Sequence, residues 1–488
     1  MLEHDAVTRR EPDAASPSPA DPRGPAVVVG LVALTLVALV LRIPRLGESL
    51  WYDEIAAWRD YGLLVRDSGI GAILASYHDP ANHVLHTFLT WVSSVLLPGS
   101  SPEVVLRLPA LLFSLGAVPA TFLLGRRIAS TRVGLFAAAL AAVVPVAVLE
   151  GTNARGYSMM IFFAAIVTER FMALLDDRGT GAILLYAVGC ALGVWSHMMT
   201  VFVPIGHAGW LLGHVIATRR VDAKVMRGVV AIGLAAIATI ACYAPILDDV
   251  IRVRSMFAAA SGPRLLGPEG WHALLALGGA WSPLAAVPGL VLVVAGGVLA
   301  WRRPTARRGI ALALLGLPLA VGLVVASGGF VYARFLLFAL PGVLVLAAIT
   351  LDRLAGRSVI GAALAMVIVT GAGLADLAVR PPRQPLLEAT EIVRGHDPRA
   401  RVLAVGLRHQ VLDVYGGDLD LAHSLFHGRD IAPALAAHDP AWLIVLYPAH
   451  VSDETWGIIG EAGFVVEARL PGWIDWGGGE VVVFRKVS

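Results

Sequence analysis

The amino-acid sequence predicts an all-α polytopic membrane protein that ends in a small α/β domain. Of its 488 residues, 57% are hydrophobic and only 15% are charged, and the mean hydropathy is +0.73. Soluble globular chains carry about 25% charged residues, so this composition excludes an ordinary soluble protein. The formal net charge of +2 gives no indication of a nucleic-acid partner, and none is expected.

Eleven apolar runs are long enough to form transmembrane helices. They fall at 26–43, 104–124, 133–149, 157–175, 181–196, 200–216, 228–247, 284–300, 310–326, 335–350 and 359–377. A further stretch, Val84 to Leu97, has 14 residues and is interrupted by His86 and Thr90. It is short for a span, so we expect a helix lying in the membrane interface. Residues 1–25 are rich in Pro, Ala and Asp and are expected to form a disordered cytoplasmic tail.

Basic residues predict the orientation of the chain in the membrane. The segments 125–132, 176–180, 217–227, 301–309 and 351–358 carry 14 Lys and Arg in 41 residues, whereas the opposite segments carry 9 in 114. Basic loops stay in the cytoplasm, so the first loop (44–102), the loop 248–283 and everything after 380 are predicted to be extracytoplasmic. The transmembrane domain is thus expected to be 26–380 and to lie in the cytoplasmic membrane.

Residues 381–488 have a different pattern. Four β-rich runs, Arg401 to Val405, Trp442 to Leu446, Phe464 to Glu467 and Val481 to Phe484, alternate with amphipathic stretches. This alternation predicts a small α/β domain. The two cysteines, Cys190 and Cys242, fall inside apolar runs and are expected to be core side chains rather than a disulfide or metal pair.

The stretch Trp51-Tyr52-Asp53-Glu54 is the strongest candidate for a functional site. It lies about ten residues past the first apolar run, where a carboxylate pair sits at the boundary between membrane and water. An aromatic anchor followed by the charged start of a helix would give the same pattern.

Other polar residues gather on the same predicted side. They are His78, Asp79, Asn82 and His83 in the first loop, Glu150, Arg155 and Tyr157 at the next turn, and Tyr332 and Arg334 at a later one. A carboxylate can remove a proton from a hydroxyl while guanidinium groups hold a phosphate. Alternatively, Glu150 pairs with Arg155, and Arg107 and Arg334 are snorkelling anchors. His83-x-x-His86 beside Asp79 would be the site of a divalent metal ion, if one is used.

These elements together resemble the GT-C glycosyltransferases. The ordered motifs are R-x-P-x-L-G-x-S-L-W-Y-D-E (Arg42 to Glu54), N-H-V-L-H (Asn82 to His86), E-x-x-x-R-L-P (Glu103 to Pro109), G-R-R (Gly125 to Arg127), N-A-R-G-Y-S (Asn153 to Ser158) and R-F-L (Arg334 to Leu336). They are most similar to bacterial relatives of protein O-mannosyltransferases and to the lipid A aminoarabinose transferase. The resemblance covers about residues 26–350.

The resemblance implies an inverting membrane transferase that takes a sugar, mannose by default, from a polyprenyl-phosphate donor. Asp53 matches the proposed general base, Glu54 is its motif neighbour, and Arg155 and Arg334 match positions that face the donor phosphate. No cofactor is implied. Many relatives have H-P-P-L-Y where this chain has His78 to His83, so a glycan, lipid or protein acceptor is equally open.

Two other functions compete with transfer. A transporter or flippase of lipid-linked sugars would share the arginines and the apolar groove, but it would usually show internal repeats, which this sequence lacks. A scaffold without catalytic activity would use the outer domain to recruit partners.

Overall fold

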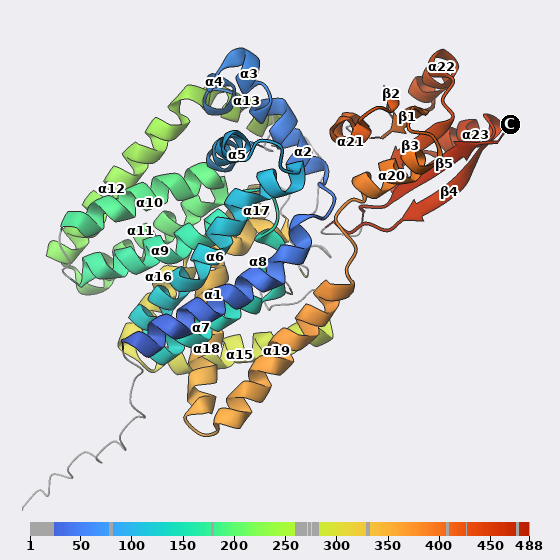
Figure 1. Ribbon diagram of the computed structural model, residues 1–488. Helices are drawn as coiled ribbons and strands as arrows, with labels where there is room; N and C mark the ends of the chain where they lie inside the picture. The colour runs from blue at the N-terminus through green and yellow to red at the C-terminus, as the bar shows by residue number, and fades with distance from the viewer. Residues whose placement is uncertain are drawn as a thin grey trace, which may run out of the picture.

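The computed structural model describes residues 24–77, 82–176, 180–258, 271, 275, 283–327, 332–406, 409–425, 427–474 and 478–487. It has a large helical bundle and a small domain with a β-sheet (Figure 1). The predicted N-terminal tail lies almost entirely outside the described residues.

The bundle consists of helices that match the predicted spans. Its elements are α1 (Pro25–Leu46), α6 (Pro102–Ile128), α7 (Thr131–Val143), α8 (Pro145–Glu150), α9 (Tyr157–Leu175), α10 (Thr180–Ser196), η2 (Met198–Val201), α11 (Phe202–Thr218), α12 (Ala223–Tyr243), η3 (Ala244–Ile246), α13 (Leu247–Ala258), α15 (Pro283–Trp301), α16 (Pro304–Leu314), α17 (Gly316–Ser327), η4 (Ala333–Ala339), α18 (Leu340–Ala355) and α19 (Val359–Val379). In the described part of the chain, eight helical stretches are long and apolar enough to cross a membrane. Three shorter apolar helices, at 131–143, 181–196 and 286–301, coincide with the remaining predicted spans.

The predicted span 133–149 is not one straight helix. It divides at Val144, whose extended backbone (φ −61°, ψ 129°) ends α7 before Pro145 begins α8. The residue before a proline avoids the helical region because the proline ring clashes with it, which explains the break. The turn 151–156 that follows α8 contacts the first loop, because Ala154 and Asn153 form hydrogen bonds with Glu54 and Trp51.

The centre of the bundle is a single apolar core. Its buried side chains include Leu140 of α7, Met160 and Phe171 of α9, Tyr186 of α10 and Leu344 of α18. Helices at the periphery, such as α1 and α12, instead expose most of their apolar side chains, as expected where lipid replaces water. The apolar residues of the sequence therefore belong to two groups, one in the packed interior and one on the outer surface of the bundle.

The first loop consists of short helices at one end of the bundle. They are α2 (Tyr52–Ala57), the π-helix η1 (Trp58–Gly62), α3 (Val65–Ser68), α4 (Gly71–Leu74) and α5 (Val84–Leu96). Among them α5 coincides with the predicted interfacial helix. Figure 1 shows α2, α3, α4 and α13 at the end of the bundle that also carries the small domain, and the α18–α19 turn at the other end.

The small domain has a five-stranded sheet in the order β2-β1-β3-β5-β4. Its elements are α20 (Leu386–His396), β1 (Arg401–Val405), η5 (His409–Leu412), α21 (Asp413–Gly416), β2 (Asp420–Ser424), α22 (Gly428–His438), β3 (Trp442–Leu446), η6 (Pro448–His450), α23 (Asp453–Glu461), β4 (Phe464–Leu470) and β5 (Val481–Lys486). Strands β1, β2 and β3 are parallel, and β5 is antiparallel to β3 and β4. The four β-rich runs match β1, β3, β4 and β5, whereas β2 was not predicted.

The small domain and the first loop share one apolar core. Leu50 and Ile55 of the first loop pack in the same cluster as Leu386 of α20, Val402 of β1 and Ile444 of β3. All five side chains are fully buried. The domain is therefore packed directly on the Trp51-Tyr52-Asp53-Glu54 stretch rather than tethered beside it (Figure 1).

Candidate functional site

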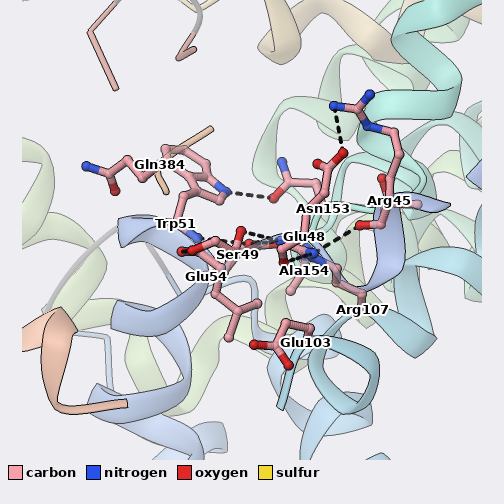
Figure 2. A network of polar contacts seen from close by, with 12 residues as sticks. Arg45, Glu48, Ser49, Trp51, Glu54, Glu103, Arg107, Asn153, Ala154 and Gln384 are labelled. Atoms are coloured by element: carbon pink, nitrogen blue, oxygen red, sulfur yellow. Dashed lines mark hydrogen bonds and ion pairs between the residues drawn. The ribbon is translucent and has the colours of Figure 1, made fainter. Parts of the chain in front are cut away.

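The carboxylate of Glu54 is fully buried, and its two oxygens accept four hydrogen bonds from described residues. Arg107 of α6 donates to it twice, from Nε to Oε1 at 3.0 Å and from Nη2 to Oε2 at 2.7 Å. The backbone N–H groups of Ala154 and Trp51 also donate to it, at 2.6 and 3.2 Å (Figure 2). A carboxylate with four such donors is held in one place, so Glu54 fixes the start of α2.

Arg107 holds the chain that precedes α2. Its Nη1 and Nη2 donate to the backbone carbonyls of Arg45, Leu46, Glu48 and Ser49 at 2.6–3.1 Å. The side chain is 4% exposed. It is therefore buried and saturated, and the alternative of a snorkelling anchor is wrong for this arginine.

A second group of bonds fixes the turn 151–156 between α8 and α9. Asn153 accepts a hydrogen bond from Trp51 Nε1 at 3.1 Å (Figure 2). It also donates to Glu150 Oε2 at 2.6 Å. Glu150 also pairs with Arg383, which lies just after α19, at 2.7 Å. The alternative in which Glu150 pairs with Arg155 does not match these contacts, because Asn153 and Arg383 bind the two carboxylate oxygens of Glu150.

Asp53 lies where the two predicted phosphate-binding arginines meet. Its Oδ2 is 3.8 Å from Nη2 of Arg155 and 3.6 Å from Nη2 of Arg334. Arg155 also donates to the Asp53 backbone carbonyl at 3.2 Å. Both arginines are about 5% exposed, whereas the Asp53 side chain is 16% exposed. The structure thus brings together three residues from three distant segments of the sequence.

Aromatic side chains surround Arg334. Its guanidinium lies 4.4 Å from the centre of the Tyr332 ring and 5.4 Å from that of Trp51, and its Nε donates to the Tyr157 hydroxyl at 2.8 Å. Cations are attracted to the faces of aromatic rings, and the attraction grows when water is excluded. Arg334 is therefore fixed in a buried aromatic enclosure, which is incompatible with a snorkelling anchor, and Tyr157 and Tyr332 shape this site.

The first-loop residues Asn82 and His83 are buried. Asn82 donates to the carbonyls of Ile73 and Ser76, at 3.4 and 3.1 Å, and so holds the loop together. His83 places Nδ1 at 2.9 Å from the carbonyl of Ser196 and at 3.3 Å from the N–H of Gly156, and its ring packs against Tyr157. Both contacts support the turn that carries Arg155.

The expected contributions of His78 and Asp79 lie outside the described residues. The possible metal site at His83-x-x-His86 would also need Asp79. In the ranges that the structure describes, no group of three His, Cys, Asp or Glu side chains could hold a metal ion.

Sequence reasoning did not single out Arg383 or Tyr415. Tyr415 of α21 accepts from the N–H of Leu50 at 2.7 Å and donates to Glu103 of α6 at 2.8 Å. Both residues belong to the region beyond the recognised motifs, so no spacing pointed to them. Arg107, by contrast, is the arginine of the E-x-x-x-R-L-P motif (Glu103 to Pro109), so the sequence did indicate this residue.

The architecture is that of known membrane glycosyltransferases. ArnT from Cupriavidus metallidurans matches over 95% of this chain and 98% of its own, with a TM-score of 0.59 and 12% identity. The chain has the GT-C fold. The same ArnT has also been solved bound to undecaprenyl phosphate, and that structure matches with a TM-score of 0.59 and 13% identity.

Two further solved structures share this fold. The oligosaccharyltransferase AglB from Archaeoglobus fulgidus, in complex with an inhibitory peptide and a dolichol-phosphate, matches over 87% of this chain and 69% of its own (TM-score 0.55, 12% identity). The mycobacterial arabinofuranosyltransferase AftD matches over 96% of this chain but only 40% of its own (TM-score 0.55, 15% identity).

Sequence comparison gives a shorter match. The family model for dolichyl-phosphate-mannose-protein mannosyltransferase matches residues 82–243, which extend from Asn82 to the end of α12 and include Arg107 and Arg155. No match was found among curated proteins.

Proposed function

We propose that this GT-C chain is a glycosyltransferase that moves a sugar from a polyprenyl-phosphate carrier to an acceptor hydroxyl with inversion. The observation that carries the proposal is the convergence of Arg155 and Arg334 on Asp53, at 3.8 and 3.6 Å. Two buried guanidinium groups beside a partly exposed carboxylate provide the two functions that such a transfer needs. One function is to hold a phosphate leaving group and the other is to activate a hydroxyl.

The step follows from this arrangement. The acceptor oxygen attacks the anomeric carbon, its proton passes to the Asp53 carboxylate, and the bond between that carbon and the phosphate oxygen breaks. The polyprenyl phosphate leaves with its negative charge held by Arg155 and Arg334. Fixed charges in a site that excludes water stabilise such a developing charge strongly. Because the arginines supply the positive charge, the scheme requires no metal ion.

Glu54 has a positioning role in this scheme. Its oxygens are occupied by Arg107, Ala154 and Trp51, so it has no oxygen to offer a substrate. It holds the peptide that carries Asp53 instead. We therefore assign base chemistry to Asp53 and not to the pair.

The candidate sugars differ in the observations that support them. Mannose is the default because the matching family model, over residues 82–243, describes a mannosyltransferase. The structural relatives carry other sugars in their names, such as arabinofuranose for AftD. Arabinose, glucose and galactose therefore belong in the same assay, and the acceptor is a glycan, lipid or protein hydroxyl.

The sidedness is part of the proposal. The basic turns favour a cytoplasmic position for the 351–358 end of the bundle, and the site and the small domain would then lie on the extracytoplasmic face of the cytoplasmic membrane. The first loop and the small domain share an apolar core, which is consistent with both being on one side.

The decisive test uses the purified protein in proteoliposomes with undecaprenyl phosphate carrying labelled mannose, arabinose, glucose or galactose. Transfer predicts release of bare undecaprenyl phosphate and a new glycosyl product when a membrane extract is supplied as acceptor. A transporter would move the intact donor across the bilayer without cleaving it. A scaffold would do neither, and intact donor in every case would overturn the proposed function.

A further inference from the structure

Tyr447 of the small domain lies close to the proposed site. It directly follows strand β3, and its ring meets the ring of Tyr52 edge-on, with centroids 6.3 Å apart at 85°. Tyr52 is the neighbour of Asp53 in the sequence, and its N–H is held by Gln384 Oε1 at 2.9 Å. The side chain of Tyr447 therefore reaches from the small domain to the start of α2.

The fold places this tyrosine at the point where a doubly wound sheet binds ligands. Strand β1 lies between β2 and β3, and all three are parallel. The chain leaves β1 toward β2 and leaves β3 toward β4 on the opposite side, so the direction reverses between β1 and β3. Crevices that bind ligands form outside the carboxyl ends of strands at such a reversal. Here Gly406 follows β1 with φ 141°, and a Cβ on it would lie 2.6 Å from the Leu446 carbonyl. The ends of β1 and β3 are thus in close contact, and Tyr447 is the first residue after β3 at that point.

The backbone of Tyr447 is held in the left-handed region, with φ 53° and ψ 56°. Residues other than glycine pay about 1 kcal/mol or more for that conformation. Tyr447 begins a turn that is closed by a hydrogen bond from the backbone N–H of His450 to the Tyr447 carbonyl at 2.9 Å. In this conformation the ring of Tyr447 meets the ring of Tyr52.

The surroundings of the ring combine apolar surface with charge. The ring packs at the edge of the apolar core shared by the first loop and the small domain and is half-buried. Burial, reinforced by the negative charge of Asp53, raises the pKa of Tyr447 well above its usual value. The phenol therefore stays neutral, and its hydroxyl makes no hydrogen bond within the part of the chain that the structure describes.

We propose that Tyr447 positions the sugar carried by the polyprenyl-phosphate donor, so that the small domain supplies part of the sugar subsite. This inference rests on the proposed function. A sugar ring has an apolar face of C–H groups and a rim of hydroxyls. An aromatic ring with a free hydroxyl can meet both, because its face is apolar and its edge is polar. During transfer the sugar lies beside Asp53 and the two arginines, and Tyr447, in contact with Tyr52, adjoins that place from the side of the small domain.

The test compares two ligands that differ only in the sugar. Binding of bare undecaprenyl phosphate and of undecaprenyl phosphate carrying mannose, arabinose, glucose or galactose is measured for the full-length protein in detergent. Tyr447→Gly removes the ring and relieves the left-handed backbone, so the fold should be kept. We expect it to weaken the best-bound loaded carrier about 10-fold and to leave bare undecaprenyl phosphate unchanged, which is the scale of one aromatic contact. Tyr447→Phe, which keeps the ring, should lose about 3-fold.

A matched control is available in the same domain. Asp439 also has a left-handed backbone (φ 44°), but it is exposed and pairs with Arg401 and Lys486 on the surface. Asp439→Gly should leave both affinities unchanged. Equal losses for bare and loaded carriers in Tyr447→Gly, or no loss for either, would overturn the proposal. Failure of the proposed function would be seen separately, as an intact donor with the unaltered protein.

Discussion

Arg107 and Glu54 form a buried, bidentate ion pair directly beside Asp53. The two hydrogen bonds are 3.0 and 2.7 Å long, and the side chains are 4% and 0% exposed. Because Glu54 follows Asp53 in the chain, the pair fixes the backbone from which Asp53 extends. The ion pair is thus placed to control the geometry of the proposed base without touching a substrate.

Removing one partner of this pair should destabilise the protein strongly. Glu54→Gln leaves the Arg107 guanidinium buried without its counter-charge, which typically costs about 3–5 kcal/mol. The free energy of unfolding can be measured by titration in mixed micelles. The control is Glu48→Gln, because Glu48 pairs with Arg45 at 3.2 Å but its side chain is 29% exposed. Partly exposed pairs are worth about 1 kcal/mol or less, so similar losses in the two variants would contradict the structural role of Glu54.

The two site arginines should act on one part of the substrate. Arg155→Ala and Arg334→Ala should each weaken donor use by about 1.5–3 kcal/mol, the value of a charge-assisted hydrogen bond. The loss in the double variant should be smaller than the sum, because both side chains address the same anion. Donor and acceptor dependence of the initial rate would be measured for all three variants. Additive losses, or losses confined to the acceptor, would return both arginines to a structural role.

The contact of the small domain with the first loop should be needed for stability. Tyr415→Phe leaves the Leu50 N–H and the Glu103 carboxylate without the shared hydroxyl, and each lost partner costs about 1–3 kcal/mol. Tyr243→Phe is the matched control, since it loses one bond to the Val194 carbonyl within the bundle. We expect Tyr415→Phe to lower the free energy of unfolding more than the control does. An equal effect would show that the junction contributes nothing beyond one hydrogen bond.

Topology can be tested with cysteine labelling. Glu461 of the small domain and Arg357 of the α18–α19 turn are both exposed, and they belong to opposite ends of the bundle. In a background lacking Cys190 and Cys242, Glu461→Cys should react with a membrane-impermeant maleimide in intact cells. Arg357→Cys should react only after lysis. The reverse pattern would show that the orientation predicted from the basic turns is inverted.

Most of the fold could be predicted from the sequence because the membrane imposes strict patterns. Apolar runs gave the helices at all eleven predicted places, and the 14-residue stretch with His86 became the short helix α5. Strand β2 was missed because Asp420 to Ser424 is only partly buried and mixes polar with apolar residues. The division at Val144 is a local effect of Pro145 inside a run that composition alone reads as continuous.

The site was predictable only in part. Asp53, Arg155 and Arg334 were named on motifs, and the structure brings them together. The partners of Glu150 and Glu54 depend on which segments the fold brings side by side. Arg383 lies 233 positions after Glu150, and nothing in the local sequence of either residue indicates the other. Long-range pairs of this kind follow from the tertiary structure and not from spacing.

The most direct test of the account is the rate of sugar transfer by Asp53→Asn. Asparagine has the same shape but cannot accept the proton of the acceptor hydroxyl. Purified variant and unaltered protein would be compared in proteoliposomes with the labelled donor that the unaltered protein uses, after equal folding has been shown by their unfolding free energies. We predict a loss of at least about 100-fold in the transfer rate, the usual scale for a general base. A variant that transfers sugar at a rate close to that of the unaltered protein would contradict the central role of Asp53.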